Sequence, residues 1–283
     1  MPELPEVETI RRGLEDYLLG HIIVSVEINY LKIFVGDPNI LVGTKILNVR
    51  RFGKVISIDL SNGMSIYAQV ILTGQFIYRG PNLKKPEEIS KKVTGGIPGK
   101  HTHVIIHLDK DGTLYYNDVR KFGRLQIIKT ENVPAHGLVG KLGPEPLKDL
   151  SKAIFTEILK NSKTMVKVLL MDQSKIAGIG NIYANDALYL GKVNPKKPAN
   201  KLNKLEVDDL YDAINKVIKK GIEVGGASEL SYVRPDGSEG EYQKHFLAYD
   251  KEGELCSRCK KKKFVKITLG GRGTYFCPHC QKL

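Results

Sequence analysis

The N-terminus combines a nucleophile and two carboxylates within six residues. Met1 is followed by Pro2, a small residue that permits removal of the methionine and would leave a free secondary amine. An α-amino group has a reference pKa of about 8, so an unprotonated fraction can attack a carbonyl-like carbon at neutral pH. Glu3 and Glu6 are close enough in sequence to lie beside that amine. Most sequences that begin Met-Pro make no use of the proline, so this pattern alone does not establish catalysis.

The cysteines predict a metal site at the other end of the chain. Two Cys-x2-Cys pairs are separated by 17 residues, Cys256 and Cys259 from Cys277 and Cys280, and no cysteine precedes them. This spacing is typical of four thiolates around one tetrahedral zinc ion, with disulfides or free thiols as the alternative. Alternating apolar residues around Gly270-Gly271 predict a β-hairpin between the pairs. Eight basic residues and no acidic one follow Cys256, which favours a nucleic-acid contact over a solvated basic tail.

Two further groups of residues fit phosphate or base recognition. Gly178-Ile-Gly180-Asn181 lies between two helical patterns, and such a turn lets backbone N–H groups and a helix N-terminus approach a phosphate. Asp118-Val-Arg120-Lys121-Phe122 places an aromatic ring among basic residues at the end of a strand pattern. Phe122 would ordinarily be a core residue. An exposed Arg and Phe together could instead hold a duplex open after a nucleotide leaves it.

Composition limits the partner class. The chain has 283 residues, with 44 Lys and Arg against 31 Asp and Glu, which gives a net charge of +13. Such a charge points to a polyanion, either nucleic acid or an anionic membrane. No apolar stretch approaches the ~20 residues of a membrane span, no basic amphipathic helix supports membrane binding, and the N-terminus lacks the apolar region of a signal peptide.

The elements that must position these residues change in type along the chain. A helical stripe of Val7, Ile10, Leu14 and Leu18 ends at Gly20, and strand patterns follow. Residues 54–60 with 64–72, and 103–108 with 113–119, are predicted to form hairpins, which suggests a sandwich or barrel. Residues 133–150 are rich in Gly and Pro and indicate a linker. Helical patterns over 166–170, 182–190 and 205–222 then lead to a polar loop and the cysteine hairpin.

Taken together, the chain resembles the formamidopyrimidine-DNA glycosylase family from residue 2 to residue 281. The matching motifs are Pro2-Glu3-Leu4-Pro5-Glu6-Val7-Glu8-Thr9, Leu72-Thr73-Gly74, Asp118-Val119-Arg120-Lys121-Phe122-Gly123, Leu142-Gly143-Pro144-Glu145-Pro146-Leu147, Met171-Asp172-Gln173, residues 178–183 and residues 271–281. The resemblance implies an α+β chain of two domains. These are an N-terminal antiparallel β-sandwich with flanking helices, and a helix–two-turn–helix domain with a four-cysteine zinc β-hairpin.

We expect four segments. Residues 1–132 would form the catalytic sandwich and 133–150 the linker. Residues 151–240 would form the helical DNA-binding domain with a loop that covers the lesion, and residues 241–283 the zinc finger with one structural Zn²⁺. The family acts on double-stranded DNA that contains an oxidised base or an abasic site. The resemblance further implies a monomer in the prokaryotic cytoplasm, associated with the nucleoid and not with a membrane.

The resemblance also implies a role for each matching residue. Pro2 would attack C1′ and form a Schiff base, Glu3 would donate the proton for base departure, and Glu6 would support them. Lys54 would serve β-elimination, and Arg272 would grip phosphates and serve δ-elimination. The remaining matches imply DNA contacts by His101, Arg120, Phe122, Leu72, Lys163, Lys167, Asn181 and Gln69, with Leu72, Arg120 and Phe122 as the wedge.

Several positions depart from the family pattern. Gln69 stands where His is common, which removes a cationic contact, and Leu72 stands where Met is common. Asp186 replaces a usual Glu. Two alternatives to an oxidised-purine glycosylase and lyase stay open at this point. One is an endonuclease VIII-type enzyme for oxidised pyrimidines, which Leu4 disfavours, and the other is a non-catalytic zinc-finger protein that senses damaged DNA.

Overall fold

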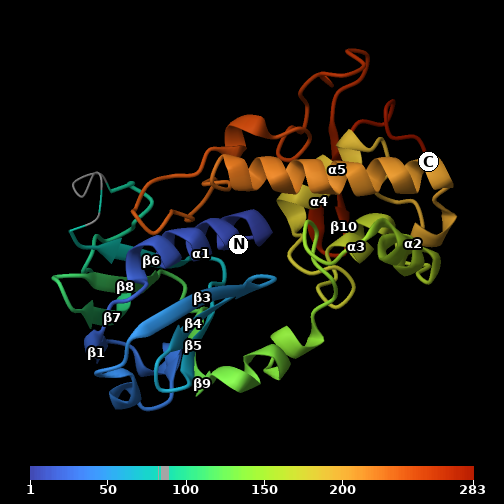
Figure 1. Ribbon diagram of the computed structural model, residues 1–283. Coiled ribbons are helices and arrows are strands. Elements are labelled where there is room, and N and C mark those ends of the chain that lie inside the picture. The colour runs from blue at the N-terminus through green and yellow to red at the C-terminus, as the bar shows by residue number, and fades with distance from the viewer. Residues whose placement is uncertain (82, 84–88) are drawn as a thin grey trace. The chain divides into compact units, whose positions relative to one another are not determined.

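A computed structural model describes residues 1–81, 83 and 89–283. Its contacts divide the chain into two compact units (Figure 1). The first unit comprises residues 1–140 and 224–243, and the second comprises residues 141–223 and 244–283.

The first unit contains two sheets that share one core. A four-stranded sheet has the order β1-β7-β8-β6, and a five-stranded sheet has the order β2-β9-β5-β4-β3. Every pairing is antiparallel except β2 with β9. Residues of both sheets, including Phe76 and Val104 of the first and Ile56 and Ile66 of the second, belong to one buried apolar cluster, which confirms the predicted sandwich. The strands are β1 (Ile23–Ile28), β2 (Phe34–Val35), β3 (Ile46–Phe52), β4 (Val55–Leu60), β5 (Met64–Gln69), β6 (Gly74–Arg79), β7 (Thr102–Leu108), β8 (Thr113–Asp118) and β9 (Arg124–Lys129).

Helix α1 (Leu4–Leu18) carries the N-terminal residues and packs into this core. Its start is specified twice. Pro5 lies in the first turn. Glu3 and Glu6 form a capping box, in which the side chain of each residue accepts the backbone N–H of the other. The apolar stripe from Val7 to Leu18 is buried, as the sequence predicts. Short 3₁₀ helices complete the unit and its boundary: η1 (Leu31–Ile33), η2 (Pro38–Leu41), η3 (Thr130–Ala135) and η4 (Val139–Lys141).

The second unit is helical with a terminal hairpin. Its helices are α2 (Lys152–Lys160), α3 (Val166–Leu170), α4 (Asn181–Leu190) and α5 (Lys204–Glu223), with the 3₁₀ helix η5 (Ala199–Lys201). The 3₁₀ helix η6 (Tyr242–His245) spans its boundary with the first unit. Strands β10 (Val265–Leu269) and β11 (Arg272–Phe276) form the predicted hairpin around Gly270 and Gly271, whose positive φ angles suit a two-residue turn. Helices α3, α4 and α5 confirm the helical patterns of the sequence, whereas α2 was not predicted.

The structure differs from the expected boundaries in two places. Residues 224–240 were expected in the helical domain and 241–243 in the zinc-finger segment, yet Tyr232 is buried in the core of the first unit and the Tyr78 N–H donates to the Pro235 carbonyl at 2.7 Å. The expected linker begins inside the first unit, because Val133 and Val139 are buried against Val55. Neither segment has a periodic hydrophobic pattern. Long-range contacts, which cannot be predicted from the local sequence, therefore determine which unit each segment belongs to. No helix among the described residues is long and apolar enough to cross a membrane.

Candidate active site and nucleic-acid interface

The N-terminal carboxylates lie in a buried network at the start of α1. Pro2, Glu3 and Glu6 are all buried, with Glu3 and Glu6 only 4% and 2% exposed. Glu6 accepts from the Glu3 N–H through Oε2 and from the Ala227 N–H through Oε1, both at 2.7 Å. The expected catalytic residues Pro2, Glu3 and Glu6 are therefore neighbours in the first unit. The Glu6 carboxylate also fixes the loop 227–240 to the start of α1.

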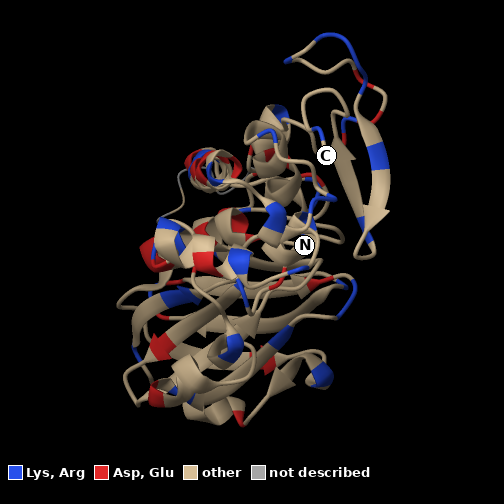
Figure 2. Ribbon diagram, turned by 90° about the vertical axis from the view of Figure 1, so that its right-hand side faces the viewer, with Lys and Arg blue, Asp and Glu red and all other residues tan. Residues whose placement is uncertain are grey.

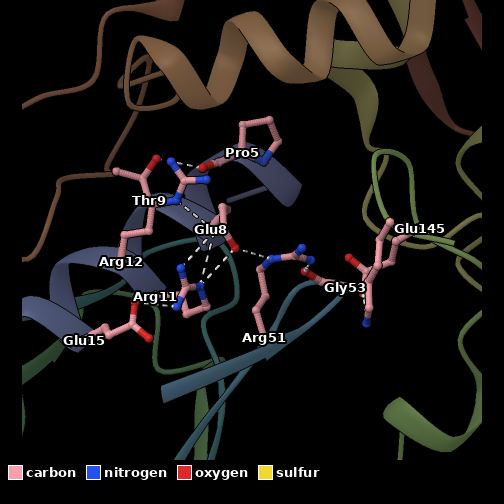
Figure 3. Close-up of polar contacts among 10 residues, drawn as sticks. Pro5, Glu8, Thr9, Arg11, Arg12, Glu15, Arg51, Gly53 and Glu145 are labelled. Carbon is pink, nitrogen blue, oxygen red and sulfur yellow. Dashed lines mark hydrogen bonds and ion pairs between the residues drawn. The ribbon is translucent and has the colours of Figure 1, made fainter. Parts of the chain in front are cut away.

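Lys54 occupies the tip of a tight turn. Phe52 pairs with Val55, so Gly53 and Lys54 alone connect β3 to β4, and Gly53 adopts a φ of +56°. Arg51 lies beside this turn, donating through Nε to Glu8 Oε2 at 2.9 Å and through a terminal nitrogen to the Gly53 carbonyl at 3.0 Å (Figure 3).

Glu8 lies at the centre of a cluster of three arginines. It accepts hydrogen bonds from Arg11, Arg12 and Arg51, and its side chain is 12% exposed. Burial alone would raise the pKa of Glu8, but hydrogen bonds from Arg11, Arg51 and Arg12 outweigh it and lower the pKa to about 2. Glu8 therefore stays ionised at neutral pH.

The expected wedge residues lie on two loops joined by one carboxylate. Asp118 is fully buried and accepts from the Thr73 hydroxyl, from the Arg120 N–H at 3.1 Å and from the Gly123 N–H at 2.7 Å. Thr73 follows Leu72, so the same group orders both loops.

These loops present an exposed aromatic and cationic pair. Phe122 is 53% exposed, and the Arg120 guanidinium lies 4.7 Å from the centre of its ring. Leu72 is half-buried and has a φ of +47°, an uncommon conformation for this residue type. Its carbonyl accepts from the Ser231 hydroxyl at 2.9 Å, which links it to the loop 227–240. The structure thus exposes Phe122, in contrast to the ordinary core position of a phenylalanine.

His101 lies among cationic neighbours at the base of the same loop. Its carbonyl accepts the Asp118 N–H at 2.9 Å. Desolvation and the nearby Lys100, His103 and Lys121 lower the pKa of His101 below its ordinary value. Gln69, at the end of β5, is half-buried and pairs with Arg124 of β9.

In the second unit, Lys167 is held inside the protein. Its side chain is completely buried, and its ammonium donates to Asn181 Oδ1 at 2.7 Å, to the Gly273 carbonyl at 2.9 Å and to the Thr274 hydroxyl at 2.8 Å. These three protein acceptors give the buried ammonium a structural role, and the phosphate contact expected of Lys167 stays a prediction. Because lysine only donates, the Asn181 oxygen must face it, and the Asn181 amino group is directed elsewhere.

The expected phosphate contacts Asn181, Lys163 and Arg272 are accessible to different degrees. Asn181 is half-buried and begins α4 directly after the Gly178–Gly180 turn, which Gln173 holds by accepting the Gly178 N–H at 2.9 Å. Lys163 is exposed between α2 and α3, and Arg272 is exposed at the first position of β11. Figure 2 shows Lys and Arg along the hairpin and the loop that precedes it.

The four cysteines fit one tetrahedral zinc ion. Their sulfur atoms all lie within 4.8 Å of one another, with 3.8 Å between the Sγ atoms of Cys256 and Cys280 and 3.7 Å between those of Cys259 and Cys277. Disulfide sulfurs would be about 2.05 Å apart. Four ligands about 2.3 Å from a tetrahedral zinc lie about 3.8 Å from each other, so the spacing fits the metal and excludes the disulfide alternative.

Sequence reasoning missed the residues that hold these groups in place. Glu8 and Asp118 belong to motifs that predicted no role for them, and no pattern in the sequence indicated Arg51 or Asn185, which accepts the Tyr275 N–H at 2.8 Å. Asp186 is buried and accepts the N–H groups of Ala248 and Tyr249 at 2.8 and 2.9 Å. A polar residue within an otherwise apolar pattern was the available signal, and Asp118, the last residue of β8, shows it most clearly.

Comparison with known proteins covers the whole chain. The N-terminal domain and the H2TH domain of formamidopyrimidine-DNA glycosylase match residues 1–125 and 142–232, and a zinc finger found in this family and in IleRS matches residues 253–283. The formamidopyrimidine-DNA glycosylases of Streptococcus thermophilus and Desulfitobacterium hafniense are 38% and 37% identical, covering 100% and 99% of this chain and 100% of each relative.

Solved structures of the same family also match the whole chain. The Lactococcus lactis Fpg bound to DNA with an abasic site is 35% identical, with a TM-score of 0.86 over 99% of this chain and 100% of that one. The same relative bound to N7-benzyl-Fapy-dG DNA matches equally well over 100% of both chains. The chain belongs to the formamidopyrimidine-DNA glycosylase family.

Proposed function

We propose that this protein is a bifunctional DNA repair enzyme that excises oxidised purines, such as 8-oxoguanine and formamidopyrimidines, and then cleaves the strand. The observation that carries the proposal is the buried cluster of Pro2, Glu3 and Glu6 at the start of α1. Membership of the family supports it. A small residue after Met1 with two buried carboxylates beside it is the arrangement that an amine catalyst needs, which favours an enzyme over a protein that only senses damage.

The chemistry divides among the residues of this cluster and its neighbours. Once Met1 is removed, the Pro2 nitrogen attacks C1′ of the damaged nucleotide, and the base leaves with a proton from Glu3. The sugar ring opens and leaves an iminium ion that draws electrons from C2′. Lys54 takes the C2′ proton, and the bond to the 3′ phosphate breaks, which is β-elimination. δ-Elimination of the 5′ phosphate follows with Arg272 on the phosphates, and water finally releases Pro2.

Access to C1′ requires that the nucleotide leave the stack, which costs a few kcal/mol of unstacking and pairing energy. We assign Leu72, Arg120 and Phe122 to the space vacated in the duplex, and the exposed Phe122 ring with its Arg120 partner supports this role. Asn181, Lys163, Arg272 and His101 are assigned to phosphates, and Lys167 to the orientation of Asn181. One Zn²⁺ held by the four cysteines stabilises the hairpin that carries Arg272.

Borohydride trapping tests the mechanism. The protein is incubated with a duplex that contains an abasic site, reduced, and digested for peptide mapping by mass spectrometry. We expect a covalent adduct at Pro2, strongly reduced in Pro2→Gly and retained in Lys54→Gln, because only the amine forms the Schiff base. An adduct that maps to Lys54, or the absence of any adduct, would contradict the assignment.

A panel of lesion duplexes tests the substrate. Excision of 8-oxoguanine and formamidopyrimidine is expected to exceed that of thymine glycol and dihydrouracil, and the reverse order would indicate an endonuclease VIII-type enzyme. Among the solved relatives, the Lactococcus lactis Fpg is also described in complex with DNA that contains an oxidised pyrimidine, so the panel must compare rates, not binding alone. We further propose that the protein acts as a monomer at the nucleoid.

A further inference from the structure

Arg51 joins the N-terminal helix to the turn that carries Lys54. The Arg51 side chain is 11% exposed and spans from Glu8, one turn inside α1, to the Gly53 carbonyl (Figure 3). Both contacts are charge-assisted, and the planar guanidinium fixes their relative direction. The link therefore sets the β3–β4 turn against the helix that begins beside Pro2.

The contact at Gly53 acts on Lys54 through covalent geometry. The Gly53 carbonyl and the Lys54 nitrogen belong to one planar peptide group, so holding the oxygen fixes the rotation of that group. Gly53 lacks a side chain to restrict it and adopts a positive φ. Lys54 is the second residue of a two-residue turn, so the orientation of this peptide governs where its side chain starts.

We infer that Arg51 is a positioning residue that sets Lys54 against the Pro2 amine for strand cleavage, an inference that rests on the proposed function. The low pKa of Glu8 supports this, because the carboxylate that anchors Arg51 remains ionised at neutral pH. Glu8 is held from its other side by Arg11 and Arg12, so the anchor is itself fixed to α1.

The strand offers a matched control next to Arg51. Arg50 also pairs with a carboxylate, donating to Asp59 through Nε and, at 3.0 Å, through a terminal nitrogen, but it makes no contact with Glu8 among the hydrogen bonds of the described residues. Arg51→Lys and Arg50→Lys are thus the same substitution at adjacent positions of β3. A lysine keeps the charge in both and loses the two-point geometry of the guanidinium.

The experiment separates Schiff-base formation from elimination. Single-turnover strand cleavage and the rate of borohydride trapping are measured on the same duplex with a preformed abasic site. For Arg51→Lys we expect cleavage to slow about tenfold, a cost typical of a slightly misplaced catalytic group, while trapping stays within about twofold. Arg50→Lys should leave both rates unchanged. Glu8→Gln loosens the same link without altering β3 and should reproduce the pattern if Arg51→Lys folds poorly.

A second comparison identifies the route of the effect. In a Lys54→Gln background, Arg51→Lys should cause no further loss of cleavage, because its effect passes through Lys54. Unchanged cleavage in Arg51→Lys, equal loss of trapping and cleavage, or a full additional loss in the Lys54→Gln background would each overturn the inference. Failure of the proposed function itself is recognised separately, because the parent protein would then form no adduct.

Discussion

At the scale of single residues, buried charged groups in this protein organise backbone segments. Glu6 accepts N–H groups from Glu3 and Ala227, and Asp118 accepts from two positions of the loop that carries Arg120. Hydrogen bonds to a charged group contribute more than neutral ones, and a buried charge without partners is costly. These carboxylates therefore specify loop conformations that the local sequence would not adopt alone.

Glu8 gives the clearest pH dependence. Its pKa is lowered from an ordinary 4.5 to about 2, so the folded state keeps the carboxylate where the unfolded chain takes up a proton. The stabilisation is complete above pH 4.5 and is lost as the pH falls to 2. Glu8→Gln should lower the free energy of unfolding at pH 7 by about 2 kcal/mol and flatten its decline between pH 4.5 and 2, measured by urea denaturation. A parallel decline in both proteins would contradict this account.

At the scale of elements, Lys167 connects three of them. It extends from α3 to the first residue of α4 and to β11, and Asn185 of α4 adds a hydrogen bond to the Tyr275 N–H. The hairpin that presents Arg272 is therefore attached to the helices through polar contacts inside the second unit. Its position depends on a lysine that never reaches solvent.

Lys167→Met tests this attachment. Methionine fills a similar volume but leaves the Asn181, Gly273 and Thr274 oxygens without their donor, so we expect a loss of about 3 kcal/mol in the free energy of unfolding. Affinity for an abasic-site duplex should fall as well, because both Asn181 and Arg272 lose their orientation. Lys163→Met, at an exposed position, is the control and should leave stability unchanged. A stable Lys167→Met protein that loses only affinity would instead favour the direct phosphate contact.

Elements with local signals could be predicted from the sequence, and those fixed by distant contacts could not. Local sequence predicts helix α1 through its apolar stripe and capping residues, and it predicts the hairpin through the Gly270-Gly271 turn. The burial of Lys167 was missed because its acceptors come from α4 and β11, about 14 and 107 residues away in sequence. The contact of Arg51 with Glu8 likewise joins positions 43 residues apart.

At the scale of the whole molecule, charge and metal act together. The net charge of +13 predicts that affinity for DNA falls with salt, by about 0.9 log unit per phosphate contact for each decade of concentration. Removing zinc with a strong chelator should weaken binding to the abasic-site duplex and reduce the salt slope by about one contact, because Arg272 loses its support. The zinc content of the protein, expected to be one ion per chain, is measured first. Equilibrium DNA titrations at several salt concentrations, with and without zinc, then give the two slopes. An unchanged slope after zinc removal would exclude Arg272 as a phosphate contact.

The course of the chain has a consequence for biosynthesis. The first unit is interrupted after residue 140 and is completed only by residues 224–243, with Tyr232 in its core. A ribosome therefore synthesises all four helices of the second unit before Tyr232 exists to close the sandwich. The first unit therefore cannot finish folding until the helices of the second unit have been synthesised, whereas consecutive domains ordinarily fold one after the other in chain order. A truncated chain that stops at residue 140 lacks Ala227, the partner of Glu6, as well as this last part of its core.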